Sequence, residues 1–418
     1  MMYYRITSTL LEASPLQQVL LTLLGISSYL FLVSSIRFHR RNTLEKKYSY
    51  NTRESMKYMT NHDAWEIQKT ILQTEFPFIV LKSLQFALFR TYGIPTISTL
   101  LLKTSQFSDS STSFKRYADT GTLIGEFMAF DPSSERSQTA IARTKFLHQG
   151  YRASGKILED DMLYTLSLFA LEPIRFVKTY EWREMTEMER CASGTYWKSL
   201  GDALGISYEA LPSGTAGFRD GLHWLEEISF WSERYEERHM KPHPRNKEIA
   251  DKTIDVLVYH LPGFMKPLGV YFASFLMDDR LRTAMMIDCP PAFFAAIFTV
   301  VLQVRRLYLR YLALPRPNFL RLDVFTEEPN KHGRNFILFY EGAPYYVQPT
   351  IWNRWGPMAW LKWALGQPLP GDDGDKYYPQ GYSTADLGPK YFEGKGRKEV
   401  EMIKEDIRAQ RVGRCPFP

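Results

Sequence analysis

One histidine has neighbours, at helical spacing, that could support cofactor chemistry. The stretch ARTKFLHQGYRASGK, residues 142–156, is typical of a helix and carries His148 among bulky apolar and aromatic residues. Tyr151 and Arg152 follow one turn later on the same face, because residues three and four positions apart are neighbours on a helix surface. A neutral imidazole there can be an axial ligand of a metal cofactor, although a histidine on an apolar helix is more often a satisfied core residue.

The helix expected before this one presents a second polar pair. The segment SFKRYADTGTLIGEFMAF, residues 113–130, has the helical period and stops at Asp131-Pro132. Arg116 and Thr120 stand at positions i and i+4, so they share one face of that helix. If the two helices pack together, an imidazole, two guanidiniums and a hydroxyl converge in an otherwise apolar interior.

Burying that many polar groups has a cost, so each of them needs a partner. One interpretation is an internal salt-bridge cluster with carboxylates of the same region. The other is a ligand that offers an axial site and propionates to the same groups. The residues alone leave both interpretations open, and the carboxylates available for the first are Asp119, Glu126, Asp160 and Asp161.

Other helices follow from apolar periodicity and capping signals. Residues 160–171, DDMLYTLSLFAL, begin with acids and are then apolar nearly all round, which predicts a buried helix. Thr186 and Glu189 have capping-box spacing, and the helix that they open should stop at Gly205. The run AFFAAIFTVVLQV, residues 292–304, is short for a membrane span, and we expect a buried helix there.

The N-terminal segment predicts a membrane anchor. No charged residue occurs from Ala13 to Ile36, and the run from Val19 onward approaches the ~20 apolar residues that cross ~30 Å of hydrocarbon. Basic residues follow the run, so the positive-inside bias predicts that everything after residue 37 is cytosolic. A cleaved signal peptide is the alternative, but the run is long for one and has no small-residue cleavage site.

Composition excludes several classes of protein. The 418 residues are 44% hydrophobic and 15% aromatic, which is enough for a large core. The net charge of +6 comes without a long basic run, so nucleic acid is not an expected partner. Three scattered cysteines form neither a disulfide framework nor a metal motif. Signatures of α/β-hydrolases, zincins and nucleotide-binding folds are also missing.

The sequence pattern changes after about residue 315. LRLDVFTE and RNFILFYEG flank the polar turn EPNKHG, residues 328–333, and could form one hairpin. The Trp-rich segment WNRWGPMAWLKWALG, residues 352–366, fits either a core helix with basic residues at its edge or a helix in the membrane interface. We therefore expect a lumenal N-terminus (1–15), an anchor (16–36), a connector (37–60), a helical catalytic domain (61–315) and a C-terminal extension (316–418).

Several of these stretches resemble a known family. The pair Arg116/Thr120 followed by His148 and Arg152 is similar to the rubber-oxygenase (latex-clearing protein) and mpaB-type superfamily. The likeness to its fungal branch, the ER-bound oxygenases of mycophenolic acid biosynthesis, covers nearly the whole chain. It is carried by FALFRTYGIPTIS, SFKRYADT, ARTKFLHQGY, ASGKILEDDMLYTLSLFA, WKSLGDALGIS, MDDRLR, LPRP, GAPYYV, WNRWGP, GDKYYPQGY, EGKGRK and CPF.

The resemblance implies a fold class and a cofactor. The fold would be mainly α, with a globin-like helical haem domain behind one transmembrane helix and a short C-terminal α+β extension. His148 would be the axial ligand of haem b iron, Arg152 a second cofactor-binding residue, and Arg116 and Thr120 catalytic residues near the haem. Asp119 stands where the rubber oxygenases carry a lysine that caps the iron, so that closed state should be absent. Glu126 is a guess for the acid–base residue.

The resemblance also implies a reaction. Dioxygen would be the co-substrate in the oxidative cleavage of a C=C double bond in the farnesyl-type chain of a prenylated aromatic, meroterpenoid intermediate. The enzyme would be a single-pass protein of the endoplasmic reticulum membrane with a cytosolic catalytic domain. The alternatives are a membrane-tethered helical interaction protein without catalysis, in which the polar cluster is structural, and the same fold with a non-haem metal.

Overall fold

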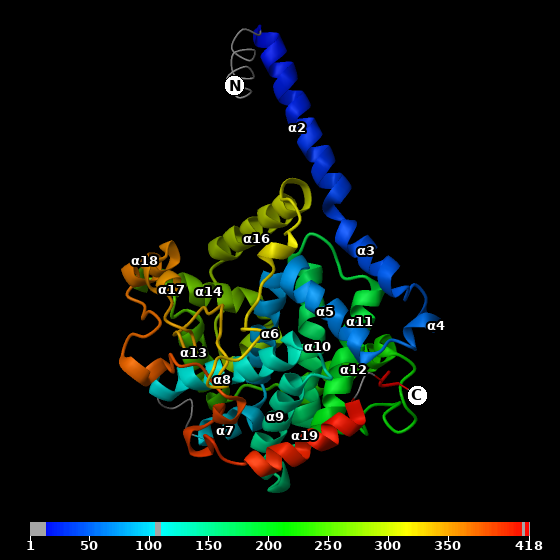
Figure 1. Cartoon of the computed structure of the whole chain (residues 1–418), viewed down its shortest axis with the longest axis vertical. Coiled ribbons are helices and arrows are strands. Elements are labelled where there is room, and N and C mark those ends of the chain that lie inside the picture. The colour runs from blue at the N-terminus through cyan, green and yellow to red at the C-terminus, as the bar shows by residue number, and fades with distance from the viewer. Residues whose placement is uncertain (1–13, 105–109, 412–413, 418) are drawn as a thin grey trace.

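A computed structural model describes residues 14–104, 110–411 and 414–417, and the part that it describes is helical and without an extended strand. The expected lumenal segment lies almost wholly outside the described residues. Helix α2 (Pro15–Arg37) projects from the globular part, as Figure 1 shows, and has a capping box at Ser14 and Gln17. The expected anchor is therefore one continuous apolar helix, long and apolar enough to cross a membrane.

The globular part contains the remaining helices in an irregular bundle (Figure 1). The first half contains α3 (His39–Tyr48), α4 (Arg53–Met56), α5 (Asn61–Thr70), η1 (Ile71–Glu75), α6 (Pro77–Thr91), α7 (Pro95–Lys103), α8 (Ser110–Ala129), α9 (Glu135–Ala153), α10 (Glu159–Tyr180) and α11 (Glu187–Leu204). The second half contains α12 (Gly221–His239), α13 (Pro244–Leu257), η2 (Gly263–Met265), α14 (Lys266–Leu276), α15 (Asp279–Met285), α16 (Ala292–Leu307), η3 (Tyr308–Leu312), η4 (Asn318–Leu320), α17 (Ile351–Trp355), α18 (Pro357–Ala364), η5 (Gly374–Tyr377), η6 (Thr384–Asp386), η7 (Lys390–Phe392) and α19 (Arg397–Arg411).

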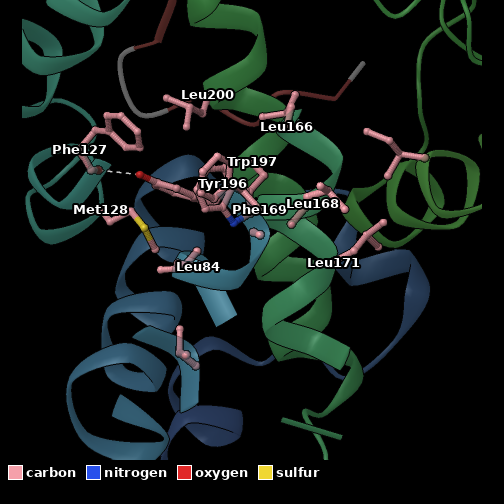
Figure 2. Close-up of a cluster of buried hydrophobic side chains, with 14 of the residues drawn as sticks. Leu84, Phe127, Met128, Leu166, Leu168, Phe169, Leu171, Tyr196, Trp197 and Leu200 are labelled. Carbon is pink, nitrogen blue, oxygen red and sulfur yellow. Dashed lines mark hydrogen bonds between the residues drawn. The ribbon is translucent and has the colours of Figure 1, made fainter. Parts of the chain in front are cut away.

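The core surrounds α10, which packs against α6, α11 and α12. Figure 2 shows its apolar side chains facing those of α11, with Phe169 stacked on Trp197 at a centroid distance of 5.3 Å. The hydroxyl of Tyr196 donates to the carbonyl of Phe127 at 2.6 Å and so ties α11 to the end of α8. The predicted buried helix over residues 160–171 is confirmed, because nearly every apolar side chain there is buried.

Local signals in the sequence place three helix ends correctly. Thr186 and Glu189 form the predicted capping box of α11, and Gly205 ends that helix with φ +69°, a left-handed conformation that glycine adopts at no steric cost. Helix α8 stops two residues before Asp131. Helices α8 and α9 then pack side by side, as the convergence of their polar faces required.

The prediction of a buried helix over residues 292–304 was wrong. Helix α16 has one buried residue, Phe298, which packs against Phe272 and Phe275 of α14. The rest of its apolar surface is exposed, and Val301 and Val304 keep more than half of their surface free. Length alone suggested a core helix, but its contacts with α14 and with the end of α10 cover only a small part of its surface.

The expected hairpin is reduced to a single isolated bridge between Phe325 and Ile337. The second segment divides its backbone bonds among other partners, because Asn335 pairs with Tyr382 and the Ile337 amide donates to the Tyr346 carbonyl. A two-stranded ladder needs one continuous partner. The α+β character expected for residues 316–418 is therefore not confirmed, and the described part of the extension consists of turns, short helices and the longer helix α19.

The Trp-rich segment forms two short helices on the surface. Trp352, Trp355, Trp360 and Trp363 are each more than half exposed. Of the two interpretations that the sequence left open, the core helix is thereby excluded.

Candidate functional site

Three of the four predicted site residues line one cavity. His148 of α9 and Arg116 and Thr120 of α8 border a space of about 550 Å³, within the usual range for small-molecule sites. The wall is mostly apolar and comes from α6 to α11, α13 and the C-terminal extension. Its apolar members include Leu88, Leu123, Phe127, Leu166, Phe169 and Trp197.

The imidazole of His148 has a defined tautomer. Its Nδ1 atom lies 2.7 Å from the backbone carbonyl of Thr144, which can only accept, so the proton belongs on Nδ1 and the lone pair on Nε2. Burial lowers the pKa of His148, and the positive charge of Arg116 lowers it further against the opposing effect of that carbonyl. The ring is therefore neutral at pH 7 and can bind a metal through Nε2.

Arg116 supplies a buried positive charge to the wall. Burial lowers the pKa of its guanidinium, while the phenols of Tyr92, Tyr391 and Tyr151 and the carboxylate of Asp119 act in the opposite direction. An arginine remains charged in proteins at neutral pH. A bound anion such as a carboxylate would offset the cost of holding that charge in a largely apolar wall.

Lys115 and Asp119 form an ion pair at the cavity wall. The Lys115 Nζ atom lies 2.8 Å from Asp119 Oδ2 and 3.1 Å from the Gly388 carbonyl, and the Tyr346 hydroxyl donates to Asp119 at 2.5 Å. Burial raises the pKa of Asp119 even though Lys115 opposes this. The pair can therefore hold a proton at the cavity wall, and the only signal for it was the i, i+4 spacing of opposite charges.

The proposed internal salt-bridge cluster is divided into separate groups. Asp119 pairs with Lys115, Glu126 binds Arg136 and the Tyr382 hydroxyl away from the cavity, and Asp161 accepts from Thr96 and Tyr235. Asp119 and Glu126 thus form ion pairs with Lys115 and Arg136, and Arg152 pairs with Glu159 instead. Glu126, the guess for the acid–base residue, connects α8 to the C-terminal extension instead.

Arg152 does not line the cavity. Its guanidinium pairs with Glu159 at 2.8 Å and donates to the carbonyls of Leu204 and Gly205 at 2.9 and 2.7 Å. It therefore caps the C-terminal end of α11, where a cation is favoured. Its neighbour Tyr151 does border the cavity, and its hydroxyl lies 3.2 Å from that of Tyr391.

Sequence reasoning missed the segment that closes one side of the cavity. Residues 388–392, here called the C-terminal strap, all line it. Buried Arg143 of α9 donates to the carbonyls of Leu387, Phe392 and Lys395 at 3.0, 2.8 and 2.7 Å and so holds the strap. Burial raises the pKa of Tyr391 in the strap to about 12, so its hydroxyl stays protonated. The local sequence pattern gave no distinctive signal for this contact, because α9 contains three arginines and a lysine.

The residues at this cavity fit a haem. One neutral histidine presents Nε2 and is oriented by a backbone carbonyl through Nδ1, and a positive charge suited to propionates lies in the same wall. Among the residues that the structure describes, no three His, Cys, Asp or Glu side chains gather into a metal-binding group. A non-haem site with three protein ligands therefore has no candidate there.

Comparison with known proteins gives close relatives over most of the chain. No protein-family model matches it. It is 52% identical over 389 residues, 93% of this chain and 92% of the relative, to ER-bound oxygenase mpaB' of Penicillium brevicompactum. ER-bound oxygenase mpaB of the same species is 48% identical over 87% of this chain and 86% of the relative. The mpaB protein of Penicillium roqueforti (strain FM164) is 57% identical over 62% of this chain and 87% of the relative.

Proposed function

The chain belongs to the mpaB family of ER-bound oxygenases, and on this premise we propose that it is a haem-dependent enzyme that oxidatively cleaves a C=C double bond in an isoprenoid side chain. Family membership makes it an oxidoreductase. The alternative of a non-catalytic, membrane-tethered interaction protein is therefore set aside. The proposed substrate is a prenylated aromatic, meroterpenoid intermediate of the mycophenolic acid type, and dioxygen is the co-substrate.

The observation that carries this proposal is the state of His148. The ring is neutral, borders a cavity of about 550 Å³, and has its Nδ1 atom committed to the Thr144 carbonyl. A structural histidine of the core would have its second nitrogen packed or bonded in the interior. Here the remaining nitrogen belongs to a ring in the wall of a space that is large enough for a ligand.

Haem bound through one histidine supplies the activation of dioxygen. The chain itself would contribute binding, orientation and exclusion of water. His148 would hold the iron, Arg116 would pair with a propionate, and Thr120 would offer a hydroxyl from the same face of α8. The apolar wall would bind the isoprenoid chain and position one double bond, since such a chain gains free energy on leaving water.

The Lys115–Asp119 pair would supply or receive a proton at the substrate end of the cavity. Its buried carboxyl has a raised pKa, and its lysine lies within hydrogen-bond distance. This assignment replaces Glu126, which contacts Arg136 outside the cavity. Asp119 stands where the rubber oxygenases carry a lysine that caps the iron. Lys115, one turn earlier on α8, nevertheless brings an amine to the cavity wall.

Localisation follows from α2 and its flanking charges. We propose that α2 crosses the ER membrane once and that the basic residues after it keep the globular part in the cytosol. The relatives are named ER-bound, which agrees with this anchor. An enzyme held there would meet amphipathic prenylated substrates at the membrane surface.

The test is the absorption spectrum of the detergent-purified chain, expressed with added haem precursor, beside three variants. We expect a Soret band in the wild type and its loss in His148→Ala, whereas the matched control His332→Ala, on the exposed surface, keeps it. A His148→Gly variant should regain the band when free imidazole is added. The absence of a band in the wild type would refute haem dependence, and an unchanged band in His148→Ala would refute the ligand assignment.

Cleavage is tested separately with a farnesylated phthalide as the probe. The purified chain and dioxygen should yield a shortened chain with a carbonyl end, detected by mass spectrometry with ¹⁸O₂ incorporation. Arg116→Gln and Thr120→Val should lower the turnover. Full turnover in both variants would remove these residues from the proposed catalytic set.

A further inference from the structure

We propose that α16, η3, α17 and α18 form a membrane-inserted platform that lies in the same leaflet as the cytosolic end of α2. This inference rests on the proposed anchoring by α2 and adds a second, non-spanning contact with lipid. The globular part would then contact the bilayer through a defined face, in addition to its attachment through α2.

The platform is an apolar surface of unusual extent. Its members come from two regions of the sequence about fifty residues apart, and both lie on the side of the globular part from which α2 extends (Figure 1). A soluble monomer seldom exposes an apolar patch of this kind. Typical exposed side chains are Phe293, Val301, Leu307, Trp352, Trp360 and Trp363.

A contact with α2 determines how deep this surface would lie in the membrane. The hydroxyl of Tyr29 donates to the carbonyl of Leu312, at the end of η3, at 2.7 Å. Tyr29 precedes Arg37, the last residue of α2, by two turns of helix. At a rise of 1.5 Å per residue, Tyr29 lies ~12 Å from the cytosolic end of α2, toward the N-terminus. If α2 spans the bilayer, the end of η3, which contacts Tyr29, is therefore inside the hydrocarbon.

Helix α16 with η3 is long and apolar enough to cross a membrane by itself, but its contacts prevent this. Near its beginning Phe298 packs against α14, and near its end Arg305 pairs with Glu181 at 2.8 Å. Arg310 of η3 lies over the rings of Phe38 and Trp182. Because both ends contact the globular part, the helix lies along the membrane instead of through it.

Charge distinguishes a lipid surface from a protein partner as the occupant. Residues 292–312 and 351–366 contain no Asp or Glu. Arg305 and Arg354 pair with Glu181 and Asp372, and Arg306, Arg310 and Lys362 carry the remaining positive charge of these segments. Basic residues beside exposed tryptophans are typical of interfacial helices on anionic bilayers. The Lys362 Nζ atom also lies 3.2 Å from the centroid of the Tyr340 ring, a cation–π contact beside the exposed tryptophans.

The experiment measures tryptophan fluorescence of the full chain in phosphatidylcholine–phosphatidylserine vesicles with or without brominated acyl chains. Bromine quenches only tryptophans that contact the acyl region. We expect strong quenching in the wild type and loss of most of it in W352F/W355F/W360F/W363F. Of the five remaining tryptophans, Trp231 is half-buried and stacks on Tyr235, and the other four are buried in the protein: Trp65, Trp182, Trp197 and Trp224. Phenylalanine keeps the surface apolar, and flotation with the vesicles confirms that the variant remains anchored.

A second probe covers α16 and does not depend on the four substitutions. Cys289 is exposed just before α16, Cys191 is buried and Cys415 is half-buried, so a nitrobenzoxadiazole label can be directed to Cys289 in a Cys415→Ser background. Its emission should also be quenched by brominated lipid, both in the wild type and in the four-tryptophan variant. Val301→Asp/Leu307→Asp should abolish this quenching while the chain still floats with the vesicles.

The outcomes separate the two proposals. A chain that floats but shows equal tryptophan quenching in wild type and variant, or none in either, refutes the platform and leaves the anchor standing. Unquenched tryptophans together with a chemically cross-linked dimer would assign the surface to a second copy of the chain. A chain that does not float with vesicles refutes the anchoring by α2, and the platform with it.

Discussion

Helices α10 and α16 are both largely apolar, yet they lie in opposite surroundings. In α10 more than half of the residues are buried, and the helix packs against α6, α11 and α12. In α16, which is the more apolar of the two, Phe298 alone is buried. The comparison shows that an apolar run does not by itself predict burial in the core, because the neighbouring elements decide how much of the helix surface the protein covers.

The charges of the two helices agree with this difference. Helix α10 begins with three acids, which favour a helix N-terminus, and it buries Glu172 beside Arg90 and Arg175. Helix α16 has no acid and ends with Arg305 and Arg306. The buried carboxylate of α10 thus has cationic partners inside the protein. In α16, Arg305 pairs with Glu181, and Arg306 carries a further positive charge that would suit an anionic surface.

The largest difference is expected when a lysine replaces an apolar residue in each helix. Leu168 of α10 is fully buried, so Leu168→Lys should prevent folding because a buried, unpaired charge costs several kcal/mol. Val301→Lys in α16 should yield folded protein, because that side chain is 58% exposed. Recovery of monodisperse protein in detergent measures both. If Val301→Lys were also insoluble, α16 would be a core helix in the detergent-solubilised state.

Truncation of an aromatic residue in each helix should give a smaller difference. Phe169→Ala removes a ring that stacks on Trp197 and lines the cavity, and we expect a loss of about 3–5 kcal/mol in the free energy of unfolding. The control Phe293→Ala, at a residue that is 70% exposed, should change that free energy by less than about 0.5 kcal/mol. Urea denaturation in mild detergent compares them. Equal losses in the two variants would contradict the assignment of opposite surroundings.

The polar contact between the two helices should contribute less. Arg305 of α16 donates to the carbonyl of Tyr180, the last residue of α10, and pairs with buried Glu181. Arg305→Gln removes a cation from that helix end, so we expect a loss of about 1–3 kcal/mol in the free energy of unfolding. The neighbouring substitution Arg306→Gln is the control and should have little effect. A similar loss in both would mean that the net charge, not the contact with α10, is responsible.

The smallest expected effect is a pH dependence of the folding stability, caused by a carboxyl group in α10. Burial raises the pKa of Asp161, so the folded state holds that proton more tightly than the unfolded state does. The stability contributed by the protonated carboxyl is therefore present below the unfolded pKa of about 3.9 and is lost as the pH rises through the higher folded pKa. Wild type should lose stability relative to Asp161→Asn as the pH rises above about 3.9, as thermal melting would show.

The exposed neighbour provides the control for this pH dependence. Asp160→Asn makes the same chemical change one position earlier, on the surface of α10. Its stability should keep a constant offset from wild type over the same pH range. If the two variants behaved alike, the pH dependence would come from the first-turn charge and not from burial.

The candidate site was predicted in part from local spacing. The i, i+4 pair Arg116/Thr120 and the apolar surroundings of His148 identified three residues that do line one cavity. The same spacing rule wrongly placed Arg152 at the cofactor site. Arg152 lies at the end of α9, where its guanidinium binds the Leu204 carbonyl of α11 and the carboxylate of Glu159. Lys115 could have been noticed from its spacing to Asp119.

The C-terminal strap was beyond prediction from local pattern. It reaches the cavity more than 230 residues after His148 along the chain, and the contacts that hold it are backbone carbonyls bound by Arg143. A carbonyl has no sequence signature, since every residue carries one. The reduced hairpin has the same cause, because its backbone groups pair with Tyr346 and Tyr382.

The sequence by itself determined the features that depend on near neighbours: the long apolar helix α2, the cap and end of α11, the buried α10, and the helical faces that carry Arg116, Thr120 and His148. Only the tertiary structure decided which groups meet across distance. It separated Arg152 from the cavity, brought the C-terminal strap to it, and left α16 exposed. The physical reason is that caps and periodicity act within a few residues, whereas burial and pairing depend on surfaces supplied by remote segments.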